Sequence, residues 1–202
     1  MSDEVVAKGG VDSGKFAPHS AGSGFVGQCV DVIAMGERVQ DFPDKPAYLA
    51  QGCALVFITG ERNEITHEFV TVSREFTVSL GPKSNLGAFL TSWLGKPLTE
   101  VQIRDGVPLH KLEGFYGLLT ISHRVSAKKR TYANILSISP VPKQMQGGLE
   151  DYRVVYSRDA YWNVKKAEYA AEAARFRSDA GAPATDDDHA PLDEDDNSGL
   201  PF

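Results

Sequence analysis

Four cations and one aromatic residue lie close together in the second half of the chain, where they could bind a nucleic-acid strand. They are Arg124, Lys128, Lys129, Arg130 and Tyr132. Cationic side chains neutralise phosphates, and a flat aromatic face stacks on any base. The flanking segments, 115–125 and 131–138, have the composition of strands, so the cations would lie at the tip of a hairpin. A turn that is basic only for solubility is the alternative interpretation.

Three further residues are candidates for the same chemistry. Arg74 interrupts the apolar side of a segment, 70–80, that otherwise alternates like a strand. A bulge that turns Arg74 to solvent is one interpretation, and an arginine beside a nucleic-acid groove is the other. Lys96 follows a predicted helix and is a second cation of this rank. Tyr116 and Tyr132 are the residues that we expect to stack on bases, whereas Trp93 is expected in the core.

The sequence does not indicate an enzyme. Its five histidines are scattered, without metal-ligand spacing, and there is no nucleophile motif or phosphate-binding loop. Cys29 and Cys53 lie in apolar runs, where we expect buried free thiols. We therefore expect no catalytic residue, no metal and no cofactor.

The end of the chain has a different composition from the rest. No Lys or Arg follows Arg177, and the last residues are Leu200, Pro201 and Phe202. The acidic residues of this segment are Asp179, Asp186, Asp187, Asp188, Asp193, Glu194, Asp195 and Asp196. A segment this charged and this poor in apolar residues is predicted to be disordered. Without these eight, 19 acidic groups remain against 21 basic ones, so residues 1–178 carry a charge of about +2.

The order of the predicted elements is typical of an OB-fold. Three strands are predicted in residues 27–80, followed by a helix with Leu86, Phe89, Leu90 and Trp93 on one face. Ser84 is its expected N-cap, and Gly95 ends it. The strands at 115–125 and 131–138 follow. We therefore predict an all-β fold with minor α: an OB-fold five-stranded barrel with a helix between strands 3 and 4. An extra strand at 152–156 and a C-terminal helix complete it.

The predicted domain organisation has four parts. Residues 1–24 form a flexible arm, 25–156 the OB-fold domain, 157–178 the C-terminal helix and 179–202 the disordered tail. The sequence has no apolar run of membrane-spanning length and no signal peptide, so we expect a soluble cytoplasmic protein that does not bind membranes. The sequence leaves oligomerisation open.

Two separate stretches resemble one family. The acidic segment ending in Leu-Pro-Phe resembles the C-terminal tail of bacterial and phage single-stranded DNA-binding proteins (SSBs). The resemblance implies that Asp193, Glu194, Asp195 and Asp196 stay solvated while Leu200, Pro201 and Phe202 dock on partner proteins. The second stretch spans about residues 50–142 and resembles bacteriophage OB-fold SSB-like replication proteins. Its motifs are a strand ending Ser79-Leu80, a helix start Ser84-Asn85-Leu86 and a helix end Ser92-Trp93-Leu94-Gly95-Lys96.

The resemblance implies a sequence-independent SSB of phage replication or recombination. Such a protein would coat single strands through a basic groove and aromatic stacking, and its tail would recruit replication or recombination proteins. Two other functions stay open from the sequence. One is an interaction protein on an OB-like scaffold, such as a DNA mimic or a modulator of a host factor. The other is a virion assembly protein whose tail prevents aggregation.

Overall fold

The computed structural model describes residues 18–179, except for residues 44, 82, 126–128, 130 and 146–148. Five strands form one antiparallel sheet in the order β3-β2-β1-β4-β5. They are β1 (Gly22–Phe42), β2 (Lys45–Arg62), β3 (Phe69–Thr77), β4 (Tyr116–Val125) and β5 (Thr131–Ser139). Helices α1 (Asn85–Leu94) and α2 (Glu100–Asp105) connect β3 to β4, and α3 (Tyr161–Asp179) follows β5. A mostly β fold with a helix between the third and fourth strands and a C-terminal helix is therefore confirmed.

The prediction of a closed barrel was wrong. In the described part of the chain, β3 and β5 are the two edges of an open sheet. These edges approach each other, but a side chain connects them: Nη1 of Arg74 donates to the backbone oxygens of Ile135 and Leu136 at 3.1 and 2.9 Å. The β4–β5 register also shifts between Thr120 and Ile121, which places a bulge at this part of β5. A bulge disrupts the regular spacing of edge groups that a further strand would pair with.

Helix α1 forms as its sequence predicts. The Ser84 side chain accepts a hydrogen bond from the backbone N–H of Gly87, and Gly95 ends the helix in the left-handed conformation with φ of 66°. The apolar face of α1 is buried against one face of the sheet, together with residues of every strand. Trp93 is part of this core, and its indole nitrogen donates to the backbone oxygen of Tyr116 at 2.8 Å.

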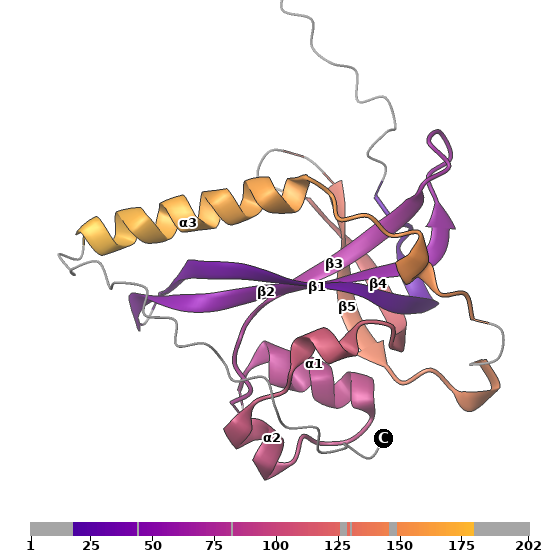
Figure 1. Ribbon diagram of the computed structural model, residues 1–202, viewed down its shortest axis with the longest axis horizontal. Coiled ribbons are helices and arrows are strands. Elements are labelled where there is room, and N and C mark those ends of the chain that lie inside the picture. Colours follow the sequence, from indigo (N-terminus) through magenta and orange to yellow (C-terminus); the bar gives the residue numbers. More distant parts are fainter. Residues whose placement is uncertain are drawn as a thin grey trace, which may run out of the picture.

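Helix α3 covers the opposite face of the sheet, so the molecule has three layers (Figure 1). Trp162 packs on the apolar side chains that β1 and β2 present to this face. The Tyr169 ring also packs against this cluster, and Ala173 of α3 is buried. Polar contacts add to this packing: Glu75 on β3 accepts hydrogen bonds from Lys165 and Tyr169, and Arg177 pairs with Glu37 on β1. Apolar packing centred on Trp162 and a set of ionic contacts therefore hold α3 in place.

The segment before α3 is not the extra strand that we predicted at 152–156. Tyr152–Val154 is a short 3₁₀ helix instead. The buried side chain of Gln28 on β1 donates to Asp151 Oδ1 at 3.0 Å and accepts from the backbone N–H of Tyr152 at 2.6 Å. These contacts with the sheet impose a turn that local composition does not show.

The described chain begins inside the segment that we assigned to a flexible arm. β1 starts at Gly22, and His19 is buried with Nε2 2.5 Å from Thr59 Oγ1. Cys29 and Cys53 are buried free thiols, as predicted, and burial raises the pKa of Cys53 to about 11. None of the helices in the described ranges is both long and apolar enough to cross a membrane.

The docking of α3 can be tested by removing its apolar anchor. Trp162 is 6% exposed, so Trp162→Ala should lower the free energy of unfolding by about 3–5 kcal/mol through the lost contacts and the cavity. Val164 on the same helix is 59% exposed, and Val164→Ala should change it by less than about 0.5 kcal/mol. Urea denaturation measures both. Equal losses in the two variants would contradict the packing described for α3.

Candidate nucleic-acid interface

The β4–β5 hairpin places one cation and one aromatic ring on the same face. Arg124 and Tyr132 are directly opposite each other in the β4–β5 register, and opposite residues of an antiparallel pair lie on one face of the sheet. Both side chains are exposed, with Tyr132 at 46%. The cross-strand partners Ile121 and Ile135, three positions nearer the core, are buried. The exposed end of this hairpin therefore offers a guanidinium beside a free aromatic face.

One further member of the predicted cation cluster, Lys129, is described between β4 and β5. Lys129 is exposed and has a φ of 58°, a left-handed backbone conformation that is common in tight turns. Lys128 and Arg130 lie outside the described residues, as do the predicted partner-binding residues Asp193, Glu194, Asp195, Asp196, Leu200, Pro201 and Phe202.

Arg74 lies close to this hairpin but is not turned out to solvent. It stays on the apolar side of β3, where its guanidinium carbon is 5.2 and 5.4 Å from the ring centroids of Phe76 and Phe89. Burial, and then the charge of Arg124, lower the pKa of Arg74. Arg74 is thus a half-buried cation that contacts β5 and interacts electrostatically with Arg124.

The structure does not bring Tyr116 and Lys96 to the same place. Tyr116 begins β4, eight positions before Arg124, which corresponds to about 26 Å along a strand. Its hydroxyl donates to the backbone oxygen of Glu150, and burial raises its pKa. Lys96 is exposed just beyond α1. Of the residues predicted for base stacking, only Tyr132 lies beside the basic turn.

The β1–β2 hairpin presents an aromatic pair that the sequence reasoning missed. Phe42 and Tyr48 are stacked, with ring centroids 6.4 Å apart and an interplanar angle of 27°. Each is 46% exposed, and Lys45 is directly opposite Phe42 in the register. The signal was present in the sequence, since two aromatic residues flank a turn marked by Pro43 and Pro46.

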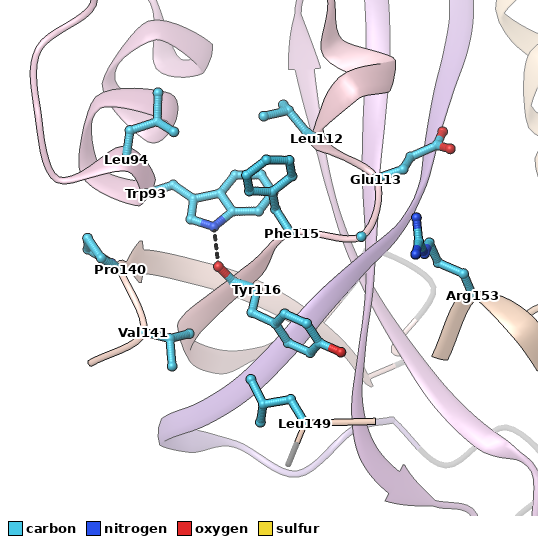
Figure 2. Close-up of a pocket in the computed structure, with 11 residues that line it drawn as sticks. Trp93, Leu94, Leu112, Glu113, Phe115, Tyr116, Pro140, Val141, Leu149 and Arg153 are labelled. Atoms are coloured by element: carbon cyan, nitrogen blue, oxygen red, sulfur yellow. Dashed lines mark hydrogen bonds between the residues drawn. The ribbon is translucent and has the colours of Figure 1, made fainter. Parts of the chain in front are cut away.

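A pocket of about 730 Å³ lies between the end of α1 and the segments around Tyr116 and Leu149 (Figure 2). Its walls are mainly apolar. Its two charged side chains already have partners: Arg153 pairs with Asp151 at 2.7 Å, and Glu113 accepts a hydrogen bond from the backbone N–H of Val32 at 3.2 Å. Within the described ranges, no group of His, Cys, Asp or Glu residues could hold a metal ion. The pocket therefore offers mainly apolar contact, and its charged side chains are already engaged.

No protein-family model, curated protein or solved structure matches the chain.

The exposed tyrosines should contribute little to folding, which makes them suitable probes of binding. Tyr132→Ala and Tyr48→Ala each remove a ring from a surface cross-strand position, where such pairs contribute about 0.2–1 kcal/mol. We therefore expect each variant to lose no more than about 1 kcal/mol in the free energy of unfolding. Thermal or urea denaturation measures this. A loss of several kcal/mol would mean that the ring is part of the core.

Proposed function

We propose that this protein binds single-stranded DNA without sequence preference and coats it during phage replication or recombination. The observation that carries the proposal is the chemistry of the two hairpins. Each combines exposed aromatic faces with a neighbouring cation: Tyr132 with Arg124 on β4–β5, and Phe42 and Tyr48 with Lys45 on β1–β2. Stacking platforms beside backbone-neutralising charges suit any base and every phosphate, which favours binding without base readout.

The order of the elements supports the same proposal. Three antiparallel strands, a helix and two further strands follow the chain order of an OB-fold, although the sheet is open between β3 and β5. In OB-folds the loop between the first two strands and the loop between the last two bind oligonucleotides. These are the two hairpins that carry the aromatic residues here.

The acidic segment has a separate part in the proposal. We propose that its carboxylates compete weakly with DNA for the basic surface, and that Leu200, Pro201 and Phe202 recruit replication or recombination proteins. The charge of the chain supports this division, because eight of its 27 acidic residues lie at 179 or beyond, where there is no Lys or Arg.

Binding is tested by a fluorescence-anisotropy titration of labelled oligo-dT, with duplex DNA of the same length as the control. We expect tighter binding of the single strand, with log K falling against log salt by about 0.7 for each phosphate neutralised. A chain ending at Ser178 that fails to bind oligo-dT at low salt would contradict the proposal. In that case the apolar pocket near Trp93 becomes the surface to examine, as a site for protein contacts.

Individual side chains should affect binding in two distinguishable ways. Tyr132→Ala and Tyr48→Ala should each weaken oligo-dT binding by about 1–3 kcal/mol, or about 5- to 150-fold, because a stacked base is lost. Arg124→Ala should instead lower the salt slope by about 0.7. Tyr161→Ala is the matched control, since Tyr161 is an exposed tyrosine on α3. An equal loss with Tyr161→Ala would show that the effect is not specific to the hairpins.

Removing the acidic segment should strengthen binding. A chain ending at Ser178 lacks all eight of these carboxylates but keeps Arg177, which contacts Glu37. We expect a lower Kd for oligo-dT at low salt and a smaller difference at high salt, where exposed charges are screened. A full-length chain with the eight acids changed to Asn or Gln separates charge from length and should match the truncated chain. Weaker binding by both would contradict the proposed competition between the acidic segment and DNA.

A further inference from the structure

The β3 and β5 edges of the sheet are joined by Arg74. One nitrogen of its guanidinium, Nη1, reaches the oxygens of both Ile135 and Leu136. The register of β4 and β5 passes from Thr120 opposite Ser137 to Ile121 opposite Ile135, so Leu136 is the unpaired residue of the bulge. Arg74 thus donates at the one place in β5 where the regular ladder is interrupted.

The neighbours of Arg74 hold its guanidinium against these carbonyl groups. The ion pairs among the described residues do not include Arg74. Its guanidinium lies near the rings of Phe76 and Phe89, which are buried on β3 and α1. Arginine stacks on aromatic faces while its planar group donates hydrogen bonds. The rings and the two carbonyl groups therefore fix the guanidinium in one place, with little freedom to follow a phosphate.

The exposed end of β5 starts next to this contact. Tyr132 is three residues before Ile135, and among the described residues the strand between them pairs only with β4. A bulge changes the direction and twist of the strand in which it lies. The direction in which β5 carries Tyr132 is therefore set by the bulge and by whatever holds the bulge in place.

We propose that Arg74 is a positioning residue for nucleic-acid binding: it fixes the β5 bulge and so presents the Tyr132 ring to a base, without contacting a phosphate itself. This inference rests on the proposed function. It assigns Arg74 a role different from that of Arg124, although the two are neighbouring cations.

The test uses the full chain, labelled oligo-dT and the variants Arg74→Met and Arg74→Lys, each first checked for cooperative unfolding. We expect Arg74→Met to weaken binding by no more than Tyr132→Ala does, about 5- to 150-fold, because it acts through that ring. Its salt slope should equal that of the wild type. In a Tyr132→Ala background, Arg74→Met should cause no further loss, which a double-mutant cycle detects.

Hydrogen exchange supplies a readout that does not need DNA. Arg74→Met should speed the exchange of the backbone amides around Ile135 while leaving those of the β1–β2 hairpin unchanged. Arg74→Lys keeps the charge but lacks the planar fork, so it should resemble Arg74→Met in both exchange and affinity.

Three results would overturn the inference. A salt slope lowered by about 0.7 in Arg74→Met, and restored in Arg74→Lys, would make Arg74 a phosphate contact. Wild-type affinity in both variants would mean that the bulge does not govern Tyr132. Additive losses with Tyr132→Ala would mean that Arg74 acts elsewhere. Absence of oligo-dT binding by the wild-type chain is a different result, because it would refute the proposed function itself.

Discussion

The contact that joins the two edges of the sheet is the one between Arg74 and the backbone of β5. The two edge strands, β3 and β5, approach each other, and edge strands with free backbone groups are exposed to unwanted pairing. Here the edges meet through one guanidinium rather than through a ladder. The Arg74 guanidinium also lies near the rings of Phe76 and Phe89, which belong to the core that α1 covers. Arg74 thus connects this core to β5 and its exposed hairpin.

The two helices that cover the faces of the sheet determine which surface stays accessible to a ligand. Helix α1 covers one face and α3 the other, so the middle of β1 and β2 is buried on both sides. Exposed aromatic side chains lie near the ends of two hairpins, at Phe42, Tyr48 and Tyr132, and also at Phe115 and Tyr161. The polar docking of α3 through Glu75 and Glu37 also consumes cations: Lys165 and Arg177 are occupied by carboxylates, whereas Arg124 takes part in none of the ion pairs among the described residues. This contrast separates structural cations from those free to bind a polyanion.

Local sequence patterns predicted the elements whose causes are local. Helix α1 has a complete apolar face, a serine cap and a terminal glycine. The features that the sequence did not predict depend on contacts between residues far apart in the chain. The turn at Tyr152 depends on Gln28, more than 120 positions away. The far half of β1 has Glu37, Arg38 and Gln40 where a core strand would be apolar, because this part of the hairpin lies beyond the core. Arg74 appeared to interrupt its strand, but the alternation continues through it.

The measurement that tests the central claim most directly is photo-crosslinking of the full chain to an oligonucleotide carrying 5-iodouracil, with the crosslinked residues mapped by mass spectrometry. This probe reacts with aromatic residues that stack on the modified base. The account predicts crosslinks at Tyr132 and at Phe42 or Tyr48, which would place one strand across both hairpins. Crosslinks confined to the pocket near Trp93 and Tyr116, or to Tyr161 on α3, would contradict it.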